Sequence, residues 1–223
     1  ISHDGGNMSG YYLLLHVLIG LFGNGELVIR LPSALAGAAT VCLTGVLGLR
    51  LFGRRVAFAA GLLTAVSLPL VFWAQDARGY ALMIAFVCGS FVAFAGLLIG
   101  DGRSRAARIA YVVCTTLALY MSVVAVLVVP AQLLVLVCKR RALRPVAAAL
   151  VLCAVLCVPL LVLAVNRGAG QLFWVPRPTF TTERQVLESL TSSSFEPNFH
   201  PTSTTVALLA LTVALLLAGV VLV

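Results

Sequence analysis

The sequence predicts an all-α protein, a polytopic transmembrane helical bundle with interfacial helices in its first outer loop. Hydrophobic residues make up 61% of the 223 residues and charged residues 10%, and the mean hydropathy is +1.10. Soluble domains are about 45–50% apolar and about 25% charged, so this composition is typical of a membrane protein. The apolar residues are gathered into runs of spanning length separated by short charged clusters, which predicts several membrane crossings.

The first apolar run, residues 11–23, is too short to span a membrane. Thirteen helical residues reach about 20 Å, whereas the hydrocarbon core is about 30 Å thick. We therefore expect a helix that lies along the membrane surface, with Asn7 or Ser9 as its N-cap. A second short segment, 26–31, leads into Pro32, which suits the first turn of the following helix.

Longer apolar runs predict the membrane spans. The whole chain, 1–223, is expected to form part of one transmembrane domain, with an outer loop at 1–31 and a second at 166–205. The predicted crossings are single spans at 32–52, 56–74, 80–99, 146–165 and 206–223, and two crossings within 109–138. The two crossings within 109–138 require a turn near Tyr120, Met121 and Ser122.

The distribution of Lys and Arg sets the orientation. Ten of the fifteen basic residues fall in three short loops, which the positive-inside rule places in the cytoplasm. They are Arg50, Arg54, Arg55, Arg103, Arg105, Arg108, Lys139, Arg140, Arg141 and Arg144. This orientation places every carboxylate except Asp101, and all three histidines, on the extracytoplasmic side. Because the basic residues cluster at the ends of apolar runs, they indicate membrane orientation and no nucleic-acid partner.

The richest chemistry lies in a short outer loop, residues 75–80 (QDARGY). A guanidinium such as that of Arg78 binds phosphate oxygens with two parallel hydrogen bonds, and a carboxylate such as that of Asp76 holds a cation or a hydroxyl group. The alternative is an ordinary polar turn whose aromatic neighbours anchor in the membrane interface. The residues alone leave both readings open.

Several motifs in one order resemble the integral-membrane glycosyltransferases of the GT-C type. The resemblance is to the family 39-like group related to protein mannosyltransferases and to the aminoarabinose transferase of lipid A. It rests on 11–16 (YYLLLH), 21–23 (LFG), 30–37 (RLPSALAG), 50–55 (RLFGRR), 75–82 (QDARGYAL) and 174–178 (WVPRP). It covers essentially the whole chain, which we expect to be an internal piece of a longer enzyme.

The resemblance implies transfer of a mannose- or arabinose-like sugar from a polyprenyl-phosphate donor. The acceptor would be a glycan, a lipid or a protein on the extracytoplasmic face of a bacterial cell membrane, among membrane lipids. Many relatives carry an Asp-x-His-Pro-Pro motif before the paired tyrosines, and this chain has Asp4-Gly5-Gly6-Asn7-Met8-Ser9-Gly10 there, without His-Pro-Pro. A divalent metal ion therefore remains an open expectation.

The same resemblance implies roles for individual residues. Arg78 matches the family's loop arginine, which implies contact with the lipid phosphate, and Asp76 matches its acidic position, which implies a catalytic role. The family's principal catalytic Asp lies in the first outer loop, in a part mostly absent here, and Asp4 is our candidate in this chain. The further substrate-binding candidates are Gln75, Tyr80, Tyr11, Tyr12, Trp174 and Arg177. The metal-binding candidates are Asp4 and His200, because carboxylate and imidazole suit divalent ions.

Two rival functions come from other classes of protein. A lipid or small-solute transporter would need charged side chains or broken helices at the membrane midplane. No Asp, Glu, Lys or His lies in the middle of a predicted span. An inactive membrane assembly subunit is the second rival, and the missing His-Pro-Pro motif favours it.

The predicted topology is testable by cysteine labelling. In a cysteine-free background, cysteines introduced at Ser104 and Ala142 should resist an impermeant thiol reagent added outside, and one at Ser193 should react. The expectation follows from the asymmetry of basic residues. Labelling of position 142 from outside would show that 109–138 crosses the membrane once.

Overall fold

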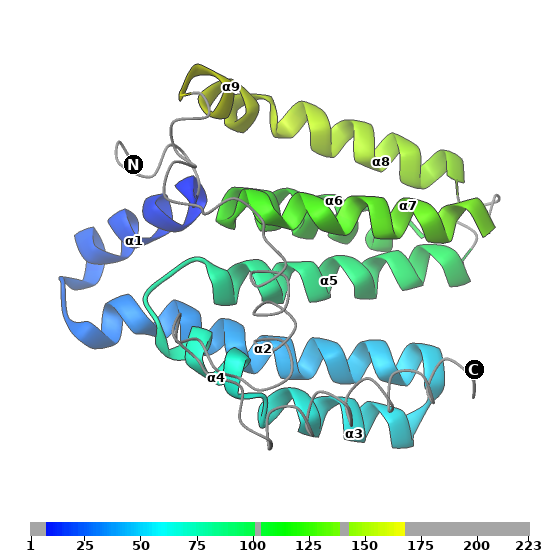
Figure 1. The fold of residues 1–223 in the computed structure, drawn as a ribbon, viewed down its shortest axis with the longest axis horizontal. Helices are drawn as coiled ribbons and strands as arrows, with labels where there is room; N and C mark the ends of the chain where they lie inside the picture. The colour runs from blue at the N-terminus through cyan, green and yellow to red at the C-terminus, as the bar shows by residue number, and fades with distance from the viewer. Residues whose placement is uncertain (1–7, 101–103, 139–142, 168–223) are drawn as a thin grey trace, which may run out of the picture. The chain divides into compact units, whose positions relative to one another are not determined.

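The computed structural model describes residues 8–100, 104–138 and 143–167 (Figure 1). In this part of the chain the secondary structure is helical and contains no strand, which confirms the all-α class. The helices are α1 (Ser9–Phe22), α2 (Glu26–Phe52), α3 (Arg54–Ala65), α4 (Leu68–Gln75), α5 (Tyr80–Ile99), α6 (Arg105–Met121), the short 3₁₀ helix η1 (Val123–Leu127), α7 (Val128–Cys138), α8 (Leu143–Leu156) and α9 (Val158–Arg167). Apart from Ser67–Pro69, the described residues form one compact unit.

Two of the described helices, α2 and α5, are long and apolar enough to cross a membrane. Their 27 and 20 residues correspond to about 40 Å and about 30 Å of helix. A third crossing is possible if α3 and α4 act as one span, although the axis of α3 and that of Pro69–Gln75 differ by 57°. The helical membrane bundle is thus supported, and α5 coincides with the span predicted at 80–99.

The start of the bundle differs from the prediction in two ways. No side chain caps α1, whose N-cap residue is Met8, so the prediction of Asn7 or Ser9 as cap is wrong. Pro32 lies inside α2, which already begins at Glu26, so the separate segment predicted at 26–31 is the first part of a longer helix. Pro32 has no N–H group and leaves the carbonyl of Val28 without its helical donor, a cost that this helix tolerates.

Two predicted spans are interrupted in the structure. The span predicted at 56–74 is divided between α3 and α4, and the span predicted at 146–165 is divided between α8 and α9. At the second break the N–H of Cys157 donates to the carbonyls of Cys153 and Ala154, at 2.9 and 3.2 Å. Pro159 follows as the second residue of α9, where the missing N–H is tolerated.

The long apolar stretch 109–138 turns back on itself as predicted. Helix α6 ends at Met121, and Ser122 is extended (φ −162°, ψ 133°) before η1 begins. The hydroxyl of Tyr111 in α6 donates to the side-chain oxygen of Gln132 in α7 at 2.7 Å. Since these residues are 21 positions apart on either side of Ser122, α6 and α7 lie side by side as a helical hairpin. That each arm crosses a membrane stays a prediction.

A chain of buried hydrogen bonds joins three helices. Beyond the bond from Tyr111, the side-chain amide of Gln132 donates to Ser90 Oγ at 3.2 Å, and Ser90 Oγ donates to the carbonyl of Val87 at 2.8 Å. Tyr111 and Gln132 are fully buried and Ser90 is 2% exposed. In a membrane, apolar helix surfaces contact lipid as readily as one another. Hydrogen bonds between helices therefore help to specify which helices pair.

Small residues bring the helices close together. A Cβ atom on Gly89 of α5 would lie 2.9 Å from Cys114 Sγ of α6, and one on Gly48 of α2 would lie 3.0 Å from Cα of Ala57 in α3. Helix α5 packs against both α2 and α6, and α6 also contacts α1 and α8 (Figure 1). Close backbone approach at small residues is the usual way in which membrane helices pack.

Removal of the Tyr111 hydroxyl should destabilise the bundle. Tyr111→Phe leaves the oxygen of Gln132 buried without its donor, which should cost about 1 kcal/mol or more. Thermal unfolding of the protein in detergent measures the change. Tyr120→Phe is the matched control, because its hydroxyl donates to Leu156 O at an exposed position. Equal loss of stability in both variants would contradict a structural role for the buried chain.

Candidate functional site

The loop between α4 and α5 consists of Asp76, Ala77, Arg78 and Gly79 and is called the 76–79 loop below. Helix α4 ends at Gln75 and α5 begins at Tyr80. The N–H of Asp76 donates to the carbonyl of Phe72 at 3.1 Å, and the carbonyl of Gly79 accepts from the N–H of Met83 at 2.9 Å. Hydrogen bonds of helical type therefore fix both ends of the loop.

Asp76 and Arg78 form an ion pair within this loop. Arg78 Nε lies 3.4 Å from Asp76 Oδ2, and the two side chains are 61% and 35% exposed, respectively. Exposed ion pairs of this kind contribute about 0–1 kcal/mol, so a ligand can replace one partner at little cost. The contact uses Nε, and the two terminal nitrogen atoms of the guanidinium remain suited to bind a phosphate from outside.

Three helices hold the loop from beneath. Ser33 Oγ of α2 donates to the carbonyl of Arg78 at 3.4 Å. A Cβ atom on Gly79 would lie 2.8 Å from the carbonyl oxygen of Met121 in α6 and 3.1 Å from Tyr11 Cβ in α1. Glycine at position 79 thus allows the loop to lie directly on α1 and on the end of α6.

Tyr11 is buried beside the 76–79 loop. It is 1% exposed, and burial raises the pKa of its phenol above the ordinary value of 10.0. The negative charge of Asp76 raises this pKa further, while the Ser33 side chain opposes the shift. The phenol therefore remains neutral, and a hydrogen-bond donor, throughout the physiological pH range.

Three hydroxyl groups where α1 meets the end of α6 are buried. In the described part of the chain, the hydroxyls of Ser9 and Ser122 make no hydrogen bond, whereas the phenol of Tyr11 lies beside the Ser33 side chain. The neighbouring residues Gly10 and Met121 are in contact, because a Cβ atom on Gly10 would lie 3.0 Å from Met121 Cε. A buried polar group without a partner costs about 1–3 kcal/mol, so such groups often mark places where a ligand or an ordered water binds.

Aromatic rings flank the loop. The ring centroids of Trp73 and Tyr80 are 4.4 Å apart with planes inclined at 59°, and those of Phe72 and Trp73 are 5.2 Å apart. Tyr12 extends the aromatic surface of α1, with its ring centroid 6.0 Å from that of Tyr11. Rings of this kind offer apolar faces and, in Trp and Tyr, a polar group at the edge.

The structure brings together part of the predicted site. Asp76, Arg78, Tyr80, Tyr11 and Tyr12 lie at one end of the bundle, and Gln75 is exposed at the end of α4. The remaining candidates, Asp4, Trp174, Arg177 and His200, lie outside the described residues.

No group of three or more His, Cys, Asp or Glu residues that could hold a metal ion occurs in the described part. The metal-binding role of Asp4 and His200 stays a prediction.

Sequence reasoning missed Ser9, Ser33 and Ser122. A serine at a helix end or in a helix carries no distinctive signal in one sequence, and its place near the 76–79 loop follows from tertiary packing. Ser33 lies in the stretch 30–37, which carries part of the family resemblance. This was the only sequence feature that could have identified Ser33 as a site residue.

The close contact at Gly79 predicts a sharp effect of a single methyl group. Gly79→Ala should force the loop away from Met121 and Tyr11, at a cost of about 1–3 kcal/mol in unfolding free energy. Gly20→Ala is the matched control, because a Cβ atom there would meet no described atom within 4 Å. Thermal unfolding of the two variants checks the expectation. A Gly79→Ala protein as stable as Gly20→Ala would show that the loop does not pack as described.

Comparison with known proteins identifies the family. The family model described as dolichyl-phosphate-mannose-protein mannosyltransferase matches residues 9–165, which is more than half of the chain. Searches of curated proteins and of solved structures found no match. The matched region includes the 76–79 loop and every helix that contacts it. The chain belongs to the dolichyl-phosphate-mannose-protein mannosyltransferase family, whose members are membrane glycosyltransferases.

Proposed function

We propose that this chain is part of an enzyme that transfers a mannose- or arabinose-like sugar from a polyprenyl-phosphate donor to an acceptor. The acceptor is a glycan, a lipid or a protein on the extracytoplasmic face of a bacterial cell membrane. The observation that carries the proposal is the partly exposed Asp76–Arg78 ion pair beside buried Tyr11. The family match supports the general reaction and the lipid-linked donor.

The reaction is a displacement at the anomeric carbon of the sugar. The acceptor oxygen forms a bond to this carbon, the bond from the carbon to the phosphate oxygen breaks, and the carrier phosphate leaves with the electron pair. The acceptor hydroxyl loses its proton to a base. The protein must therefore provide positive charge for the departing phosphate and a group that takes the proton.

Arg78 provides the positive charge in this proposal. Its main-chain carbonyl is held by Ser33, and its terminal nitrogen atoms can bind two oxygens of one phosphate. When phosphate binds, the weak contact to Asp76 is replaced by a charge-assisted pair. The carboxylate is then released beside the bound donor, where it can orient an acceptor hydroxyl or accept its proton.

The flanking rings orient the substrate, and buried Tyr11 supports the loop that carries the ion pair. Trp73 and Tyr80 offer apolar faces against which a sugar ring can stack, while Tyr11 packs against Gly79. Asp4 is the candidate for a second carboxylate, and Trp174 and Arg177 are candidates for further contacts with the donor. A transporter finds no support in the described buried polar chain, because Ser90, Tyr111 and Gln132 bond one another and carry no charge.

The proposal predicts that conservative changes in the ion pair reduce transfer without reducing stability. Arg78→Lys keeps the charge but loses the planar pair of donors, and Asp76→Asn keeps the size but loses the charge. Loss of a contact to charge that develops in the transition state costs about 2.7–4 kcal/mol, or roughly a hundredfold to a thousandfold in rate. The measurement is transfer of labelled sugar from a polyprenyl-phosphate donor by the full-length protein in reconstituted membranes.

Two variants control for nonspecific effects. Glu26→Gln breaks the other described ion pair, to Arg30 at 3.0 Å, and Arg55→Lys changes an exposed arginine at the start of α3. Both should transfer sugar at the normal rate. Near-normal transfer by Arg78→Lys and Asp76→Asn would reduce the loop to an interfacial turn. Failure of these two variants to accumulate would show that the pair is structural.

A further inference from the structure

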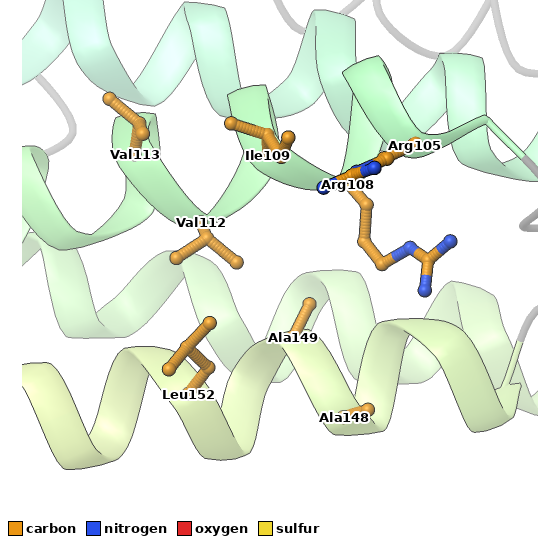
Figure 2. Close-up of a pocket in the computed structure, with 8 residues that line it drawn as sticks. All are labelled: Arg105, Arg108, Ile109, Val112, Val113, Ala148, Ala149 and Leu152. Atoms are coloured by element: carbon orange, nitrogen blue, oxygen red, sulfur yellow. The ribbon is translucent and has the colours of Figure 1, made fainter.

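A second site with different chemistry lies at the other end of α6. A groove of about 480 Å³ runs between α6 and α8 and is called the α6–α8 groove (Figure 2). Its mouth carries Arg105 and Arg108, and its walls are Ile109, Val112, Val113, Ala148, Ala149 and Leu152. This volume falls within the range of about 300–1,000 Å³ that is typical of pockets for small ligands.

The two arginines lie in the first turn of α6, where the helix dipole disfavours cations. Arg105 is the first residue of α6 and Arg108 lies in the same turn, which contains no acidic residue. The N-terminus of a helix has partial positive charge, so it stabilises an anion and repels a guanidinium. The mouth of the groove therefore combines the positive charges of two arginines with the partial positive charge of the N-terminus of α6.

The side chain of Arg108 is oriented toward the groove, and its Nε–H group has no hydrogen-bond acceptor among the described residues. Figure 2 shows its side chain extending from α6 into the space beside α8. Its Nε atom is buried and makes no hydrogen bond to any described residue. A buried charged donor without an acceptor is costly, so an anion at this position would stabilise the protein.

The described residues supply little negative charge to neutralise the N-terminal end of α6. The carboxylates among the described residues are Glu26 and Asp76, which pair with Arg30 and Arg78. In sequence, the stretches 100–108 and 139–144 together contain seven basic residues and one acid, Asp101. Among the described residues no carboxylate pairs with Arg105 or Arg108, so a bound anion would help to balance their charge.

The groove below the arginines suits a hydrocarbon chain. All six wall residues are apolar, and Ala148 and Ala149 leave room that larger side chains would fill. Val112 and Leu152 extend from opposite helices in Figure 2. A ligand with a phosphate at one end and an acyl chain at the other would match both parts of the site, as in basic pockets that bind anionic lipids.

We propose that the α6–α8 groove binds an anionic phospholipid, with its phosphate on Arg105 and Arg108 and one acyl chain along 109–113 and 148–152. This site is separate from the 76–79 loop, because the 17 residues of α6 place its two ends about 25 Å apart. With the predicted orientation, the lipid belongs to the cytoplasmic leaflet, whereas the proposed donor binds on the extracytoplasmic side.

Native mass spectrometry of the full-length protein tests the proposal. The protein in neutral detergent is mixed with equal amounts of phosphatidylglycerol and phosphatidylcholine of the same chain length, and the retained lipid is counted. We expect at least threefold preference for phosphatidylglycerol. Arg105→Gln combined with Arg108→Gln should abolish the preference, while Arg55→Gln combined with Arg54→Gln, an equal change of charge outside the groove, should keep it.

A second variant separates lipid binding from simple attraction of anions. Ala148 is exposed, and Ala148→Leu narrows the groove while both arginines remain. It should reduce retention of phosphatidylglycerol severalfold and serves as the test if the double arginine variant does not accumulate. Equal retention of the two lipids by the unchanged protein, or full retention by Ala148→Leu, would overturn the proposal. Displacement of the lipid by inorganic phosphate at equal concentration would instead identify a phosphate site.

Discussion

The buried hydrogen bonds of Gln132 with Tyr111 and Ser90 join α7 to α6 and α5, and the arrangement of these three helices depends on them. In an apolar environment a buried amide must find a partner, so Gln132 has a strong preference for the register in which it meets both Tyr111 and Ser90. Helix α6 ends at Met121, where Ser122 becomes extended. Since α6 also contacts α1, α5 and α8, its position determines how these helices are arranged.

The hairpin also separates two kinds of chemistry. At the Met121 end, the turn brings a main-chain carbonyl against Gly79, and this contact seats the loop that carries the ion pair beside Tyr11. At the other end, arginines stand over an apolar groove. We propose that both ends bind phosphate through guanidinium groups, the first beside hydroxyls and aromatic faces suited to a sugar and the second beside a surface suited to an acyl chain.

Much of this architecture was predictable because composition and apolar run length reflect the membrane directly. The helical class and the span at 80–99 follow from such patterns, the turn near Ser122 follows from the positions of Lys and Arg, and the 76–79 loop was distinguished by its charges. The division of 146–165 at Cys157 was missed, since an apolar run has the same pattern whether its helix is continuous or broken. The partners of Tyr111 and Ser33 were missed because tertiary packing alone sets them. The roles of residues outside the described part remain predictions.

We propose that the 76–79 loop and α1 contact the lipid-linked donor. Photocrosslinking tests it most directly, with a polyprenyl-phosphate sugar that carries a diazirine next to its phosphate. After irradiation of the full-length protein in membranes, we expect labelled peptides that contain residues 76–80 or 9–12, and weaker labelling in Arg78→Lys. Labelling confined to peptides from 105–113 or 148–152, with 76–80 and 9–12 unlabelled, would contradict it.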